Sequence, residues 1–241
     1  MALEQFELQL ISAKSLGPAI RHLEFERTDG KPLNFIPGQF ITLLLKNAAG
    51  ELKRRSYSIA SPPGEKTFAI AISYVKGGIA SELLFNLQAK HAPIKAMGPA
   101  GRLVLQPESI KRYFLIGTGT GIAPYRAMLP LLAQHQETQF EIILGVQYRS
   151  GALYAEDFLA FSKAHSHCRF HNCLSREASD FHPHEQKGYV QNLLHTLKAN
   201  PQEDVVYLCG NPNMIDDSFK LLTEMGFPSD RVRREKYVSS N

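Results

Sequence analysis

Residues 113–134 read YFLIGTGTGIAPYRAMLPLLAQ, an apolar run followed by a glycine-rich turn and a mixed stretch. The run at 113–117 predicts a buried strand, and apolar residues at helical spacing from about 123 to 134 predict a helix. Glycines leave no side chain between the main chain and a ligand, and a helix start offers free amides and the positive end of its dipole. Pro124 suits the first turn of that helix. The stretch predicts a pyrophosphate-binding turn; the alternative is a tight strand–helix turn without a ligand.

Strands and helices alternate from this stretch to the C-terminal end. Further strands are predicted at 140–146, 169–174, 205–209 and 231–237, and helical spacing recurs at 153–164, 190–197 and 212–225. Such alternation implies right-handed crossovers and a parallel sheet covered on both faces. We predict an α/β domain with a five-stranded parallel sheet.

The N-terminal part of the chain has a different pattern, with short alternating runs between turn signals. Strands are predicted at 6–11, 20–26, 40–45, 54–60 and 67–74. Their spacing predicts a small antiparallel β-barrel, with one helix after Gly77-Gly78. We place the boundary near 106–109, which gives two domains: the barrel at 1–106 and the α/β domain at 107–241.

Composition excludes several classes of protein. The chain has 241 residues, 44% hydrophobic and 21% charged, which fits a globular protein rather than a disordered or fibrous one. No apolar run approaches the ~18 residues of a membrane span, and no signal peptide is visible. A net charge of +4 is too small to indicate nucleic acid but suits docking to an acidic protein. The three cysteines exclude a four-cysteine iron–sulfur cluster held by these residues alone and favour a cytoplasmic location.

A second candidate site lies in the barrel part. In Arg55-Ser56-Tyr57-Ser58, alternation puts Arg55 and Tyr57 on one face of a strand and the two serines on the other. An arginine beside an aromatic ring can hold a phosphate and stack on a flat ring. Further along, Gly77-Gly78-Ile79-Ala80-Ser81 opens a helix, with Ser81 as a hydroxyl donor. Taken singly, each feature also fits an ordinary barrel surface or turn.

Four motifs occur in order: RSYS at 55–58, Gly78-x-x-Ser81, GTGTGIAP at 117–124 and CGNPNM at 209–214. Together they resemble the ferredoxin–NADP reductase superfamily, and most closely its bacterial ferredoxin (flavodoxin)–NADP reductases. The resemblance extends from PGQF at 37–40 to REKYV at 234–238. It implies that the barrel binds FAD and that the α/β domain binds NADP(H).

The resemblance also implies a role for residues at matching positions. Arg55 would contact the FAD pyrophosphate, Tyr57 would stack on the isoalloxazine and Ser58 would bond its N5 atom. Cys209 and Gly210 would lie near the nicotinamide ring, and Glu235 would supply a charge or proton, unless it is a plain surface carboxylate. Ser58, Cys209 and Glu235 are thus the candidate catalytic residues. The remaining candidate cofactor-binding residues are Ser56, Ile72, Tyr74, Val75, Gly77, Gly78, Ile79, Ala80 and Ser81 for FAD, and Thr118, Gly119, Thr120 and Gly121 for the nucleotide.

The C-terminal segment departs from the family pattern. Many members end with an aromatic residue over the second face of the flavin, whereas this chain continues past Tyr237 with Val238-Ser239-Ser240-Asn241. Either Tyr237 covers the ring or Val238 takes that place.

The sequence favours NADPH over NADH. No acidic residue that could hold a ribose diol follows the second predicted parallel strand. In the resembling reductases, a Ser-Arg pair with a nearby Lys and Tyr binds the 2′-phosphate and adenine, and Ser175, Arg176, Lys187 and Tyr189 match them here. The alternative is that Ser175 and Arg176 only cap and solvate their loop.

We expect no metal site. His165, His167, Cys168, His171 and Cys173 are close in sequence, as metal ligands often are. The predicted strand at 169–174 would keep these side chains from converging.

The main hypothesis is an FAD-bound reductase between NADPH and ferredoxin or flavodoxin, which we expect to be a monomer. Alternatives are an NAD(P)H:flavin reductase, the reductase component of an oxygenase, and a non-catalytic nucleotide-binding regulator. Basic residues at 53–54 and at 231–236 could form a positive rim for an acidic carrier, or only a solvated face.

Overall fold

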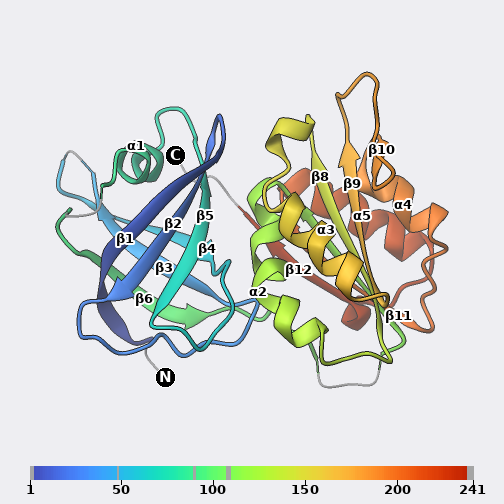
Figure 1. The fold of residues 1–241 in the computed structure, drawn as a ribbon, viewed down its shortest axis with the longest axis horizontal. Helices are drawn as coiled ribbons and strands as arrows, with labels where there is room; N and C mark the ends of the chain where they lie inside the picture. Colours follow the sequence, from blue (N-terminus) through green and yellow to red (C-terminus); the bar gives the residue numbers. More distant parts are fainter. Residues whose placement is uncertain (1–2, 48, 89–90, 107–109, 238–241) are drawn as a thin grey trace. The chain divides into compact units, whose positions relative to one another are not determined.

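The computed structural model describes residues 3–47, 49–88, 91–106 and 110–237. The chain divides into two compact units, the first ending at Leu105 and the second beginning at Gln106 (Figure 1). No helix in the described part is long and apolar enough to cross a membrane.

The N-terminal unit is an antiparallel sheet that closes on itself. Its strands are β1 (Gln5–Gly17), β2 (Ile20–Arg27), β3 (Phe40–Lys46), β4 (Leu52–Ser58), β5 (Thr67–Ser73) and β6 (Ile94–Ala100). They pair in the order β4-β3-β6-β1-β2-β5. Directly after β4, Ile59 bridges Ile70 of β5, and the amide of Ala60 donates to the Ala69 carbonyl at 2.7 Å. This contact joins the two edge strands, so the predicted barrel is confirmed.

Strand β6 is absent from the sequence prediction, which gives five strands in this unit. It contains Gly98-Pro99, and proline removes a ladder donor while glycine weakens a strand. Its pairing with β1 and β3 therefore comes from tertiary context.

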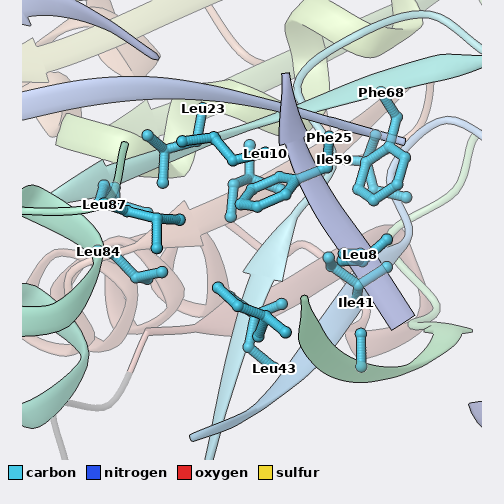
Figure 2. Close-up of a cluster of buried hydrophobic side chains, with 14 of the residues drawn as sticks. Leu8, Leu10, Leu23, Phe25, Ile41, Leu43, Ile59, Phe68, Leu84 and Leu87 are labelled. Atoms are coloured by element: carbon cyan, nitrogen blue, oxygen red, sulfur yellow. The ribbon is translucent and has the colours of Figure 1, made fainter. Parts of the chain in front are cut away.

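The barrel core runs into the short helix α1 (Ile79–Phe85). Figure 2 shows Leu84 of α1 and Leu87 at one end of the cluster and Phe68 at the other. Leu84 is fully buried and Leu87 nearly so. The helix therefore closes one end of the core that the strands enclose, and its position depends on that packing.

The C-terminal unit is a parallel sheet with helices on both faces. Its order is β10-β9-β8-β7-β11-β12, and every pair is parallel. The strands are β7 (Arg112–Thr118), β8 (Gln139–Val146), β9 (Cys168–Leu174), β10 (Glu185–Lys187), β11 (Asp204–Gly210) and β12 (Val232–Lys236). The α/β class is confirmed, but the sheet has six strands where five were predicted. The additional strand, β10, has three residues and no apolar periodicity.

Helices α2 (Ala123–Leu132) and α3 (Ala155–Ala164) cover one face, and α4 (Val190–Thr196) and α5 (Pro212–Glu224) cover the other (Figure 1). Phe158 of α3 stacks on Phe170 of β9 with ring centroids 5.3 Å apart. On the opposite face, Val190 and Ile215 pack with Ile116 of β7 in one buried cluster. Burial on both faces explains why the central strands are nearly all apolar.

Candidate functional site

The glycine-rich turn follows β7 as predicted and begins with the short 3-10 helix η1 (Gly119–Ile122), which leads into α2. Two of its glycines have different surroundings. A Cβ on Gly121 would lie 2.3 Å from the carbonyl oxygen of Cys209, so this position must be glycine for the main chains to meet. Gly119 has φ of +52° and open space where a Cβ would be. The turn therefore exposes bare main chain at Gly119, beside the unpaired amides of a helix start.

The end of β11 is joined to this turn. The backbone amide of Asn211 donates to Thr118 Oγ1 at 2.9 Å. The Asn211 side chain in turn accepts from the amides of Asn213 and Met214, which caps the start of α5. The carboxyl ends of β7 and β11 thus form one continuous edge, which is where open parallel sheets bind ligands.

Cys209 lies within this edge and is fully buried. It pairs in register with Gly117 of β7 on one side and Glu235 of β12 on the other. Burial raises the pKa of its thiol well above the usual value, the Glu235 carboxylate raises it further, and a hydrogen bond with the Tyr237 side chain opposes both. Cys209 is therefore a neutral thiol at physiological pH.

Tyr237 is the last described residue, and its amide donates to the Gly210 carbonyl at 2.8 Å. Its side chain lies at Cys209, so the structure brings together three of the predicted residues: Cys209, Glu235 and Tyr237. Val238, the other candidate for covering a flavin, lies outside the described residues.

The predicted phosphate-binding residues lie in the segment that follows β9. The amides of Ser175 and Arg176 donate to Val146 and Gln147, which holds this segment against the end of β8. The side chains of Arg176 and Lys187 are exposed and have no bonded partner among the residues that the structure describes. Tyr189 is 70% exposed. These groups are therefore free to bind a ligand.

Gln191, at the start of α4, is a candidate ligand-binding residue that the sequence did not indicate. Its Nε2 donates to the Met214 carbonyl of α5 at 3.4 Å, but its buried Oε1 has no partner in the described part of the chain. An unpartnered buried acceptor is uncommon and fits a position that a ligand completes.

The barrel site is built on β4. Arg55 and Tyr57 pair with Leu43 and Ile41 of β3, so both lie on the face that these core residues occupy. The Tyr57 ring packs against the barrel core, and burial raises its pKa to about 12 while the Arg55 charge opposes that shift. Ser56 faces the other way and bonds Thr42 through the two hydroxyl oxygens, 2.9 Å apart. Ser58, at the end of the strand, is buried.

The turn before α1 is held by a hydrogen bond to the hydroxyl group of Ser81. The amide of Gly78 donates to the Val75 carbonyl at 2.9 Å, and the amide of Val75 donates to Ser81 Oγ at 2.8 Å. Ser81 is buried and thus shapes the turn that was expected to hold phosphates. The other predicted residues differ in exposure. Ile72 and Ala80 are buried, Gly78 and Ile79 half-buried, and Tyr74, Val75 and Gly77 exposed.

Arg21 of β2 was missed by the sequence analysis. Its guanidinium donates to the carbonyl oxygens of Leu84 and Phe85 at the C-terminal end of α1. The last turn of α1 has no basic residue of its own, so Arg21 supplies the cation that a helix C-terminus favours.

Side chains of the histidine- and cysteine-rich strand β9 contact the neighbouring strand β8. His171 Nε2 lies 2.8 Å from Glu141, which also pairs with Arg169. Within the described ranges, no three His, Cys, Asp or Glu side chains gather as a metal site requires.

Two domain models match the two units. An oxidoreductase FAD-binding domain matches residues 7–105, and an oxidoreductase NAD-binding domain matches residues 115–220. A relative 33% identical, "Ferredoxin--NADP reductase B" of Sorangium cellulosum strain So ce56, aligns over 97% of this chain and 98% of its own length. The chain belongs to the ferredoxin–NADP reductase superfamily. The resemblance carried by the four sequence motifs is thereby confirmed.

Two other proteins are similar over nearly the whole chain. The "Toluate 1,2-dioxygenase electron transfer component" of Pseudomonas putida is 27% identical over 98% of this chain and 68% of its own length. A ferredoxin NADP+ reductase from Neisseria gonorrhoeae, solved with FAD and NADP, superposes with a TM-score of 0.81 at 21% identity, covering 98% of this chain and 99% of that one. This structural likeness supports the fold.

The residues present fit the two cofactors of this superfamily. The open main chain at Gly119 and the unpartnered Gln191 Oε1 suit a nucleotide in the C-terminal unit. In the N-terminal unit, Arg55 and Tyr57 share a face, as a phosphate and a flat ring require. The chain is a flavin oxidoreductase with an FAD-binding and an NAD(P)-binding domain.

Proposed function

We propose that this protein transfers a hydride between NADPH and bound FAD and exchanges single electrons with ferredoxin or flavodoxin. The observation that carries the proposal is the alignment to a ferredoxin–NADP reductase over nearly the full length of both chains. Bound FAD can take a hydride and give electrons one at a time, and the protein orients and tunes it. The FAD domain would span 1–106 and the nucleotide domain 107–241, in a cytoplasmic monomer.

In this proposal three parts of the barrel unit hold FAD. Arg55 binds the pyrophosphate, Tyr57 stacks on the ring and Ser58 donates to N5. The chain at Ile72, Tyr74 and Val75 passes along the cofactor, and the turn at Gly77–Ser81 holds its phosphates. The shared face of Arg55 and Tyr57 supports this arrangement, because one rigid strand fixes both groups.

The C-terminal unit holds the nicotinamide nucleotide. Residues 118–121 bind its pyrophosphate through main-chain amides, and Cys209 and Gly210 lie at the nicotinamide. The neutral thiol of Cys209 offers a polarizable surface without a charge, and Glu235 keeps a carboxylate beside it in register. These residues position the ring and donate no electron pair to it.

We assign the preference for NADPH to Ser175, Arg176, Lys187 and Tyr189. Arg176 and Lys187, which have no bonded partner among the described residues, lie at the two ends of the 175–187 segment, and arginine offers several fixed donors to a phosphate. Gln147, Tyr148 and Arg149 follow β8, so the chain places no acidic residue directly after that strand to hold a ribose diol.

Steady-state kinetics with both nucleotides tests the proposal. The purified protein should be yellow with one FAD per chain and should have a higher kcat/KM for NADPH than for NADH. Arg176→Ala should raise the KM for NADPH and leave the KM for NADH nearly unchanged. Lys220→Ala, which removes an exposed cation of α5, is the matched control. If the kcat/KM of the unmodified protein for NADH equals or exceeds that for NADPH, the proposed preference for NADPH is wrong.

A second candidate is the reductase component of an oxygenase system. The toluate dioxygenase component aligns over almost the whole of this chain, which favours it. The two functions differ in acceptor. A ferredoxin or flavodoxin reductase should reduce free carriers of many sources, whereas an oxygenase component should turn over rapidly only with its cognate iron–sulfur protein. Colourless protein that reduces added free FAD or FMN would indicate a flavin reductase and contradict both.

A further inference from the structure

The segment between β9 and β10 projects beyond the carboxyl end of β9 (Figure 1). Together with β10 it forms the 175–187 segment, which begins with Ser175 and Arg176 and ends at Lys187, and Tyr189 follows. The backbone at both ends of this segment is held by the sheet, because the Arg176 amide donates to the Gln147 carbonyl and Lys187 pairs in register with Leu174 of β9. The interior projects away from the sheet and needs contacts of its own to keep one conformation.

Arg149 fixes that interior. Its Nε donates to Glu185 Oε1 at 2.8 Å and its Nη2 to Glu185 Oε2 at 2.7 Å, a bidentate pair. Nη2 also donates to the Asp180 carbonyl at 2.7 Å. Arg149 follows β8, so one side chain ties the segment to the neighbouring strand's end.

The backbone around the pair adds further links. The Arg149 amide donates to Glu177 Oε2 at 3.1 Å, and the His182 amide donates to Glu185 Oε2 at 2.9 Å. Contacts from Arg149 or Glu185 thus reach the segment at 177, 180, 182 and 185. The Glu185 side chain is 1% exposed, so breaking the pair would leave a buried charge without its partner.

The Nε and Nη2 atoms of Arg149 therefore have hydrogen-bond partners, whereas the side chains of Arg176 and Lys187 have none in the described part of the chain. Its guanidinium fork is directed at Glu185, whose charge balances its own. The hydrogen bonds from Arg149 lower the pKa of Glu185 to about 2, so both groups stay charged throughout the pH range of an assay. These bonds fix the segment around Arg149.

We propose that Arg149, paired with Glu185, is a positioning residue that fixes the 175–187 segment so that Arg176 and Lys187 meet the 2′-phosphate of NADPH. This inference rests on the proposed function and names the residues behind its nucleotide preference. The bidentate geometry implies that a single-point cation replaces Arg149 only in part.

Kinetics and binding of five variants test the inference: Arg149→Ala, Arg149→Lys, Glu185→Gln, Arg176→Ala and, as control, Lys220→Ala. The probes are NADPH, NADH and 2′,5′-ADP, the last by calorimetry. Arg149→Ala should raise the KM for NADPH and the Kd of 2′,5′-ADP roughly tenfold, as misplaced binding groups do. Its kcat and its KM for NADH should change less than about twofold, and Arg149→Lys should be intermediate.

Glu185→Gln separates positioning from direct binding. It leaves Arg149 in place but removes its anion, so a positioning role predicts weaker 2′,5′-ADP binding. Tighter binding would make Arg149 a phosphate ligand and overturn the inference. This variant and Arg149→Lys carry the test if Arg149→Ala does not fold.

The failures of the two proposals are distinguishable. If Arg176→Ala leaves the NADPH-to-NADH ratio of kcat/KM unchanged, the proposed 2′-phosphate site is wrong. If Arg176→Ala lowers that ratio but Arg149→Ala and Glu185→Gln do not, only the positioning role is wrong. Equal losses for NADPH and NADH in the Arg149 variants would show general damage to the unit and would also overturn it.

Discussion

In the turn after β7, the two glycines at positions 119 and 121 are required for different reasons. At Gly121 a methyl group would overlap the main chain of β11. At Gly119 a methyl group would meet no other atom, and the residue is glycine because its backbone has a positive φ angle. One position serves packing, and the other leaves room for a ligand. The two can therefore be separated experimentally by the same small substitution.

Gly121→Ala should destabilise the C-terminal unit by about 2–3 kcal/mol, because two main chains would have to move apart. Gly119→Ala should cost about 1–2 kcal/mol for its backbone angle, while NADP+ affinity falls because the methyl group fills the open space. Urea denaturation and titration with NADP+ measure both quantities. If the two variants were equally stable, the assignment of a packing role to Gly121 alone would be wrong.

The three cysteines give a second test at this scale. All are free and buried, and burial raises the thiol pKa of Cys168 and Cys173 to about 12 and that of Cys209 well above its usual value. The folded protein should therefore react slowly with Ellman's reagent from pH 7 to 9, and three thiols should react in urea. A rapidly titrating thiol in the folded protein would show that one of these side chains is accessible. Cys209→Ser should retain the fold.

Helix α1 shows how an element depends on residues distant in sequence. It has seven residues, and isolated helices of that length are unstable in water. Leu84 anchors it in the barrel core and Arg21 binds its last carbonyl groups. Both supports come from tertiary structure, so the geometry of the Gly77–Ser81 turn follows from the barrel.

Arg21→Ala should loosen α1 and increase the rate at which FAD dissociates. Loss of hydrogen bonds from a charged donor at a half-buried site costs about 1–3 kcal/mol, so thermal stability should also fall. Lys95→Ala, which removes an exposed cation of β6, is the matched control and should leave both quantities unchanged. FAD release can be followed by the increase in flavin fluorescence. Unchanged release from Arg21→Ala would mean that the helix does not need this contact.

Local sequence patterns predicted the elements that local chemistry specifies. The apolar run and glycines at 113–121 gave β7 and its turn, and alternation placed Arg55 and Tyr57 on one face. Strands β6 and β10 were missed because a Gly-Pro pair and a three-residue length conceal them. Arg21 and Arg149 could not be recognised, since their partners lie 63 and 36 positions away along the chain. No periodicity reports contacts of that kind.

At the scale of the whole molecule, charge governs encounters with a partner. Within the expected basic rim, Lys236 pairs with Asp216 at 2.6 Å and the Arg234 guanidinium lies 3.6 Å from the Phe219 ring centroid. The pairing of Lys236 reduces the net positive charge of β12, while Arg234 keeps its charge over a neutral ring. Attraction to an acidic carrier should consequently be moderate.

Reduction of an acidic ferredoxin or flavodoxin should slow as potassium chloride is raised from 10 to 300 mM, because salt screens charges separated by more than about 10 Å. Reduction of menadione, an uncharged acceptor, should change little and serves as the control. Asp216→Asn should strengthen the salt dependence by releasing Lys236. A carrier rate independent of salt would show that docking does not use charge.

Leu84 belongs at once to the buried core of the barrel and to the helix that opens at the proposed phosphate turn. A ligand that binds the native turn and not the unfolded chain adds its binding energy to folding. If FAD binds at this turn as proposed, the supply of its vitamin precursor should affect the amount of this protein as well as its turnover. In riboflavin-starved cells, chains made without the cofactor would open more often at this end and be degraded sooner.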